Sequence, residues 1–198
     1  MHRRTVRPVV AVLAMAALVA GALSACAPAD GPRIALLLPD KKTARYETFD
    51  RPVFEERVAE RGDYGVLYAN ADQDAAKQQQ QAESALAAGV EVLVLDPVDA
   101  KAAATIVNAA RAQDVPVVSY DRLVEGGGLA YYVSFDNERV GELQADALSR
   151  ALEGREDDGI LMVNGSPTDS NAALFRKGAI DVLASACSSP TLSLSNDT

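Results

Sequence analysis

The sequence predicts an α/β fold with a doubly wound parallel sheet, followed by the start of a second α/β lobe. Short apolar runs rich in Val, Ile and Leu alternate with longer segments of helical periodicity, as in chains built from repeated strand and helix units. Several runs end directly in Pro, Asp or Asn, which stop a buried strand. With 198 residues and 48% apolar content, the chain is long enough for one full domain and part of another.

Five apolar runs are the expected strands of the first lobe. In chain order they cover residues 33–38, 64–69, 90–95, 115–120 and 129–135. Each run is bounded by turn residues, as buried strands are. Because helices fit between successive runs, the strands are expected to lie parallel, with right-handed crossovers.

Helices are expected between these strands. They cover residues 51–60, 70–88 and 100–112. Asp50 is a candidate N-cap of the first helix, and Asn70 or Asp72 opens the second, because their side-chain oxygens can accept from free backbone N–H groups. Gly89 closes the second helix, as glycine commonly does at this position.

For two stretches inside these helices, the sequence predicts whether the side chains face solvent or the sheet. The four glutamines at 78–81 continue a helical stripe and are interpreted as a solvated helix face. In the third helix, Ile106, Val107 and Ala110 are available to pack on the sheet.

Two loops of the first lobe can be recognised from their composition. A polar turn covers residues 40–48. The three glycines at 126–128 lack GxGxxG spacing and are not followed by a helix, so they indicate a strand connection and not a phosphate-binding loop.

Beyond the fifth strand, the pattern begins a second α/β unit. It consists of a helix over 139–152, a charged turn, a strand over 160–163, the loop 164–171 and a helix to about residue 183. The expected division is a signal peptide at 1–25, a linker at 26–32, an N-terminal lobe at 33–135, an incomplete second lobe at 136–183 and a disordered tail at 184–198. The tail prediction rests on its Ser, Pro, Asn and Asp content without an amphipathic stripe.

The charge of the chain argues against nucleic-acid binding. The net charge is −9, and Arg3, Arg4 and Arg7 account for three of the 19 basic residues, whereas all 28 acidic residues follow position 25. An acidic protein repels a phosphate backbone.

The N-terminus is interpreted as a targeting segment. Three arginines precede an apolar run over 9–23, which is shorter than the roughly 20 residues of a spanning helix. The segment resembles a bacterial lipoprotein signal, whose Leu-Ser-Ala-Cys lipobox is matched at 23–26. This resemblance implies that Cys26 becomes the lipidated first residue, anchored to the outer face of the cell membrane. An ordinary secretory signal, or an uncleaved anchor, is the alternative.

The mature chain offers little for enzyme chemistry. His2, the one histidine, lies inside the targeting segment, and Cys187 is the one cysteine after Cys26. A histidine base, a His-dependent triad and a His-ligated zinc site are therefore excluded from the mature chain. We expect no enzyme activity, no cofactor and no metal, although carboxylate chemistry stays open.

Asp121 and Arg122 are the first candidate binding residues. They directly follow the run 115–120, and ligands of open α/β sheets bind outside the carboxyl ends of the strands. A carboxylate can accept from two sugar hydroxyls, while a guanidinium donates in a fixed fork. The residues alone leave open a functionally silent ion pair at a strand end.

Several segments together resemble the periplasmic sugar-binding proteins of ABC importers, in the xylose-binding branch of the ribose-binding-like group. The segments are Ala44-Arg45-Tyr46, Asp50-Arg51, Tyr120-Asp121-Arg122, Ser134-Phe135-Asp136-Asn137, Gly141-Glu142-Leu143-Gln144 and the run 165–172. The similarity covers about residues 33–183. It implies two periplasmic-binding-protein-like lobes that close on one monosaccharide, and an ABC permease as partner.

The resemblance also implies which residues contact the sugar. Arg45, Asp121 and Arg122 would do so from the first lobe. Asp169 and Asn171 would do so from the second, although helix capping by Asp169 is compatible with this role. Tyr46 lies where the family usually has a tryptophan, so it is the implied stacking residue against the sugar ring.

The expected function is therefore a lipid-anchored solute-binding protein that captures a monosaccharide, xylose or a related aldose. Family members run to roughly three hundred residues, so a C-terminally truncated, non-binding remnant is the main alternative. A LacI-type effector-binding regulator without its DNA-binding domain shares the fold, but a lipobox stands where its helix-turn-helix would be.

Overall fold

The computed structural model describes residues 31–153 and 160–186. The chain divides into two units, Met1–Gly31 and Pro32–Thr198. The predicted signal peptide, the lipidated Cys26 and most of the predicted tail lie outside the described residues. Among the described residues, no helix is long and apolar enough to cross a membrane.

A five-stranded parallel sheet forms the centre of the second unit, and its strand order is β2-β1-β3-β4-β5. The strands are β1 Arg33–Leu38, β2 Gly65–Asn70, β3 Val92–Leu95, β4 Val117–Tyr120 and β5 Tyr131–Val133. Leu37 of β1 pairs with Ala69 on one side and with Leu95 on the other. The predicted fold class and all five predicted strands of the first lobe are confirmed.

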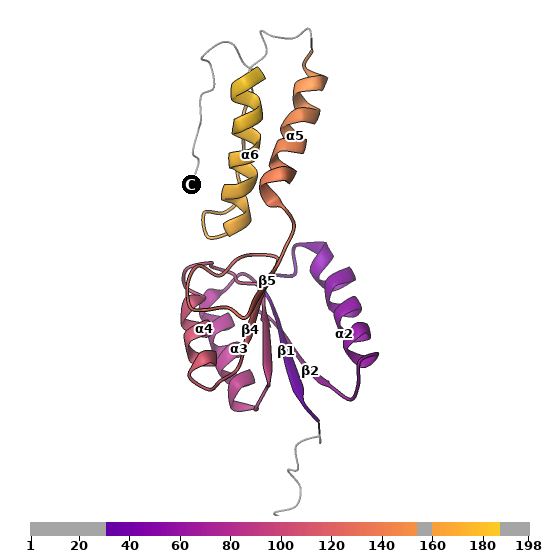
Figure 1. The fold of residues 1–198 in the computed structure, drawn as a ribbon, viewed down its shortest axis with the longest axis vertical. Coiled ribbons are helices and arrows are strands. Elements are labelled where there is room, and N and C mark those ends of the chain that lie inside the picture. Colours follow the sequence, from indigo (N-terminus) through magenta and orange to yellow (C-terminus); the bar gives the residue numbers. More distant parts are fainter. Residues whose placement is uncertain (1–30, 154–159, 187–198) are drawn as a thin grey trace, which may run out of the picture. The chain divides into compact units, whose positions relative to one another are not determined.

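Helices cover both faces of the sheet (Figure 1). On one face α3 Ala75–Ala87 and α4 Ala104–Arg111 enclose the larger core. Ile106, Val107 and Ala110 point into this core, as predicted. On the other face α2 Arg51–Ala59 lies over a smaller core that contains Leu36 and Leu38.

The segment before α2 differs from its prediction. A π-helix, η1 Tyr46–Asp50, runs directly into α2, so the expected turn is partly helical. Asp50 has helical backbone angles and makes no side-chain cap, contrary to prediction. Its carboxylate accepts instead from Arg45, at 2.9 Å. A side chain that binds a neighbouring cation is not free to cap the helix.

The second helix begins later than predicted, and its glutamines are not all solvated. Asp74 is the N-cap of α3, through the N–H of Lys77. Gln78 is 1% exposed. Its amide donates to the Asp96 carbonyl and accepts from the Val98 N–H. Gln78 therefore joins α3 to the end of β3, and the predicted solvated face is wrong at this position.

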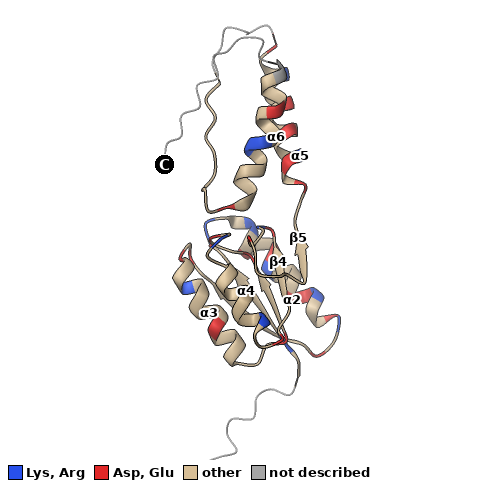
Figure 2. Cartoon of the chain, turned by 60° about the vertical axis from the view of Figure 1, so that its left-hand side comes forward, with Lys and Arg blue, Asp and Glu red and all other residues tan. Residues whose placement is uncertain are grey.

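The last two helices, α5 Asn137–Ala151 and α6 Ser170–Ala186, pack on each other. Acidic residues recur along α5 (Figure 2), and one of them, Glu138, pairs with Lys177 of α6. Two glycines, Gly141 and Gly178, lie at the crossing. A Cβ atom on Gly141 would overlap the backbone carbonyl of Phe175, and one on Gly178 would overlap that of Glu138.

The strand predicted at residues 160–163 does not form. Leu161 is 72% exposed and Val163 is 87% exposed. No described segment pairs with them, and an unpaired strand has no partner for its backbone hydrogen bonds. An apolar run that needs a neighbouring strand stays extended and irregular without one.

Candidate binding site

The candidate site begins at the turn after β4, where Asp121 has a φ of +59°. Few residues other than glycine adopt this backbone region, but aspartate tolerates it. The buried Ser119 closes the turn, because its hydroxyl donates to the Arg122 carbonyl and accepts from the Val124 N–H. The Asp121 carbonyl accepts from the Ser134 hydroxyl at 2.6 Å. These bonds hold Asp121 and Arg122 at the carboxyl end of the sheet.

The Asp121 carboxylate is the centre of a hydrogen-bond cluster. Its Oδ2 accepts from Arg45 Nη2 at 2.6 Å and from the Tyr46 hydroxyl at 2.9 Å. Its Oδ1 accepts from Asn171 Nδ2 at 3.1 Å. Residues from the end of β4, from the segment around η1 and from α6 therefore meet on one carboxylate.

Arg122 is surrounded by acidic groups. Its Nε lies 3.0 Å from Asp169 Oδ2 and 3.9 Å from Asp96 Oδ1, and its Nη2 lies 3.7 Å from Asp40 Oδ2. Burial alone would lower the pKa of Arg122, but the nearby Asp96, the Tyr46 phenol and Asp169 raise it above its ordinary value. The guanidinium therefore stays charged.

Asp169 has two roles in this arrangement. One oxygen binds Arg122, while the other accepts from the Asn171 N–H in the first turn of α6, at 2.9 Å. Asn171 is itself positioned by Asn137, whose amide donates to Asn171 Oδ1 at 2.9 Å. Helix capping and participation in the cluster thus occur together.

Tyr46 occupies an unexpected environment. It is 2% exposed and packs in the smaller core with Leu36 and Leu38. The Arg45 guanidinium lies 5.0 Å from its ring centroid. Burial, with Asp96 and Asp121 nearby, raises the pKa of the Tyr46 phenol above its ordinary value. Stacking of this ring on a sugar stays a prediction; the structure adds a hydroxyl contact to Asp121.

The structure thus brings all six predicted binding residues of the described chain into one cluster. Sequence reasoning missed other members, namely Asp40, Asp50, Asp96, Ser134 and Asn137. Asp96 comes directly after β3, and Asp40 follows β1 with one residue between them, at the point where the strand order changes direction. The rule that identified Asp121 applies to both, so their position in the sequence was an available signal.

Residues that could hold a metal ion are not grouped in this way. Within residues 31–153 and 160–186, no set of three or more His, Cys, Asp or Glu side chains has the arrangement of a metal site. The acidic groups of the cluster face two guanidinium groups instead.

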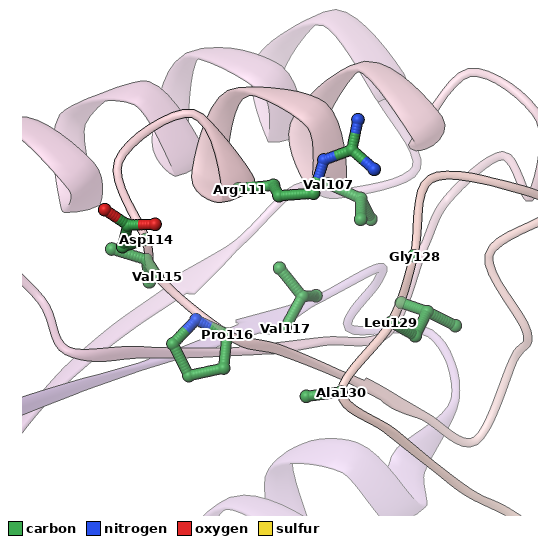
Figure 3. A pocket seen from close by; sticks show the side chains of 9 residues that line it. All are labelled: Val107, Arg111, Asp114, Val115, Pro116, Val117, Gly128, Leu129 and Ala130. Carbon is green, nitrogen blue, oxygen red and sulfur yellow. The ribbon is translucent and has the colours of Figure 1, made fainter.

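A separate cavity of about 250 Å³ lies between α4, the start of β4 and the loop before β5 (Figure 3). Its charged lining residues are Arg111 and Asp114, and most of its other lining residues are apolar. None of the clustered residues lines it. The cavity and the candidate site are therefore separate features.

Comparison with known proteins assigns most of the chain to one family. The model of the periplasmic binding protein domain matches residues 34–197. The D-xylose-binding periplasmic protein of Haemophilus influenzae is 34% identical over 151 residues, which are 76% of this chain and 44% of that protein. The multiple sugar-binding periplasmic receptor ChvE of Rhizobium radiobacter is 31% identical over 159 residues, which are 78% of this chain and 44% of the receptor.

Solved structures agree. A carbohydrate transporter solute binding protein from Chloroflexus aurantiacus, in complex with D-glucose, superposes with a TM-score of 0.74 at 34% identity, covering 86% of this chain and 49% of that one. An ABC transporter solute binding protein from Clostridium phytofermentans with bound β-D-glucose has a TM-score of 0.74 at 27% identity, covering 82% and 51%. The chain spans about half the length of the relatives it matches.

Proposed function

The chain belongs to the periplasmic binding protein domain family, and on that premise we propose that it captures a monosaccharide for an ABC-type sugar importer. The ligand proposed is xylose or a related aldose. Support comes from relatives that are named as D-xylose-binding and multiple sugar-binding proteins and from similar structures that contain D-glucose. These relatives are binding proteins, which supports capture without chemical conversion.

The observation that carries the proposal is the paired acid and base after β4. A sugar hydroxyl both donates and accepts, so adjacent carboxylate and guanidinium groups can satisfy neighbouring hydroxyls. Asp121 is about nine-tenths buried at its side chain, and Arg122 is 16% exposed. Burial sharpens selection, since an analogue that lacks one hydroxyl leaves a polar group unpaired at about 1–3 kcal/mol.

We assign roles to the remaining residues on the same basis. Arg45 and Tyr46 approach Asp121 from the first lobe, and Asp169 and Asn171 approach from the segment that opens the second. In this proposal residues 33–135 form the first sugar-binding lobe, and residues 136–183 begin the second. A ligand between them would exchange some of these internal contacts for its own hydroxyls.

Calorimetry with a panel of pentoses and hexoses tests the proposal. The protein is expected to give saturable heat with at least one aldose, and Asp121→Asn is expected to weaken binding by about tenfold or more, as for loss of a charged hydrogen-bond partner. Asparagine tolerates the positive φ, so the backbone turn is kept. Asp63→Asn, on an exposed loop, is the matched control. Absence of heat with every sugar would refute the proposal.

We propose a location outside the cytoplasm, with lipidated Cys26 as the anchor and an ABC permease as the partner. Relatives named as periplasmic proteins support the location, and the lipobox at 23–26 supports the anchor. Acyl chains contribute about 0.8 kcal/mol per buried methylene. Cys26→Ser is therefore expected to move the protein from the membrane fraction to the soluble one. Equal membrane retention of the variant would contradict the anchor.

A further inference from the structure

Asp96 is a buried carboxyl group that neither the family resemblance nor the proposed contacts use. It directly follows β3 and is 0% exposed. Neither of its side-chain oxygens has a hydrogen-bond partner among the described residues. Gln78 lies nearby but binds only backbone groups, namely the Asp96 carbonyl and the Val98 N–H. An orphan carboxyl group in an otherwise well-paired cluster needs a physical explanation.

The groups that face Asp96 come from four elements. Tyr46 belongs to η1, Arg122 and Asp121 follow β4, and Asp169 precedes α6. Asp40, after β1, reaches the same guanidinium as Asp96 does. Two of these groups are donors, and both are engaged elsewhere: the Tyr46 hydroxyl with Asp121 at 2.9 Å, and Arg122 Nε with Asp169 at 3.0 Å.

Asp96 is therefore better accommodated in its neutral form. An ionised carboxylate without a hydrogen-bond donor is costly to bury. Burial raises the pKa of Asp96 well above its usual value, and the charge of Asp121 raises it further. The positive charge of Arg122 and the polar Tyr46 side chain lower this pKa, but by less.

Sugar binding would change which donors are free. A sugar hydroxyl that donates to Asp121 competes with the Tyr46 hydroxyl, and sugar hydroxyls that bind Asp169 compete with Arg122. The donors displaced in this way have Asp96 as a neighbouring acceptor, because Arg122 Nε already lies 3.9 Å from its Oδ1.

We propose that Asp96 is a positioning residue which is neutral before sugar binds and ionised afterwards, when it accepts hydrogen bonds from Tyr46 and Arg122. The proton that leaves the carboxyl group passes to the buffer. This inference rests on the proposed sugar-binding function. Its consequence is that sugar affinity rises with pH while unbound Asp96 is neutral and bound Asp96 is ionised.

The protein without sugar provides the first test. The pKa of Asp96 is raised in the folded state. The neutral carboxyl group therefore contributes its full stability below the unfolded-state pKa, which is near 3.8. This contribution is lost as the pH rises through the folded-state pKa. Relative to Asp96→Asn, the wild-type unfolding equilibrium is expected to shift toward the unfolded state by about tenfold per pH unit within that window. Urea unfolding from about pH 4 to 8 measures this, with Asp63→Asn as control. If the free energy of unfolding varied with pH in the same way for wild type and Asp96→Asn, the inference would be overturned.

Calorimetry of sugar binding provides the second test. D-xylose and D-glucose are titrated at several pH values from about 4 to 8, each in two buffers of different ionisation enthalpy, which reports the number of protons released. Wild type is expected to release up to about one proton, and Asp96→Asn none. Asp96→Leu, which cannot accept a hydrogen bond, is expected to bind more weakly than Asp96→Asn.

The outcomes separate the two claims. Binding by wild type without proton release, or equal release by Asp96→Asn, would overturn the role of Asp96 alone. No heat with either sugar would overturn the proposed function, and the sugar-linked proton release with it.

Discussion

At the scale of single residues, the site depends on side chains that each bind two partners. Arg45 is the clearest case, since its Nε binds Asp50 and its Nη2 binds Asp121. A guanidinium can bridge two carboxylates because its donors are fixed in a fork. Asp50 therefore contributes indirectly, by orienting the group that holds Asp121.

Replacing Arg45 by lysine should separate charge from geometry. An ammonium group keeps the positive charge but cannot make both contacts, so Arg45→Lys is expected to lower sugar affinity by about tenfold. Arg111→Lys changes a remote, exposed arginine that donates to the Gly127 carbonyl and should leave affinity unchanged. Calorimetry with the best sugar measures both, and equal affinities would contradict the bridging role.

Tyr46 offers a second test at this scale. Tyr46→Phe removes the hydroxyl that donates to Asp121 and keeps the ring packed against Leu36 and Leu38. In the proposed mechanism that hydroxyl also serves Asp96, so the variant should bind sugar more weakly, by about threefold to tenfold for one neutral donor, and its affinity should depend less on pH. Unaltered affinity and pH dependence would show that the ring alone matters.

Sequence reasoning found the six site residues that follow β4 or match the family's sugar contacts. It missed members whose contacts arise only in the fold, although Asp50, Ser134 and Asn137 lie in segments that resemble the family. Asp121 and Arg122 follow an apolar run, so their place at the sheet edge could be predicted. The burial of Gln78 could not, because a glutamine among good helix formers carries no sign of the strand end it will meet. Asp50 was misassigned for the same reason, since its partner Arg45 depends on a π-helix that no local pattern indicated.

At the scale of elements, the bridge between α3 and β3 should be important for stability. Gln78→Ala would leave the Asp96 carbonyl and the Val98 N–H without their partner, and each unpaired buried group costs about 1–3 kcal/mol. Gln80→Ala, at an exposed position on the same helix, is the matched control. Urea unfolding should show a clear loss for Gln78→Ala only, and similar midpoints for the two variants would contradict the bridge.

At the crossing of α5 and α6, a glycine-to-alanine substitution should lower the stability of the protein instead of raising it. Glycine to alanine inside a helix normally stabilises by about 0.5–1 kcal/mol. At Gly178 the added methyl would overlap the Glu138 carbonyl, so Gly178→Ala should destabilise the protein by about 1–3 kcal/mol, as overpacking does. Gln144→Ala, exposed on α5, is the control. A stabilised Gly178→Ala variant in urea unfolding would contradict the close crossing.

The helices and strands also show when a pattern of apolar residues is enough to predict a strand. The five strands of the sheet form because each has a parallel neighbour within the chain. The run 160–163 has similar residues but no described neighbour, and it stays irregular. A strand is specified by its partners as much as by its own composition.

At the scale of the whole molecule, a member of a sugar-binding-type family carries one cluster of polar side chains at the carboxyl end of its sheet. The family follows from the model of the periplasmic binding protein domain, which matches residues 34–197. The cluster draws on segments that are far apart in the sequence, from Asp40 to Asn171. The central claim is that a monosaccharide binds within this cluster, on Asp121 and Arg122.

A crystal structure of the protein with D-xylose or D-glucose tests that claim most directly. We expect sugar hydroxyls within hydrogen-bond distance of the Asp121 carboxylate and the Arg122 guanidinium, with the Tyr46 hydroxyl turned from Asp121 toward Asp96. A sugar bound elsewhere, with the contacts of Arg45, Tyr46 and Asn171 to Asp121 unchanged, would contradict it.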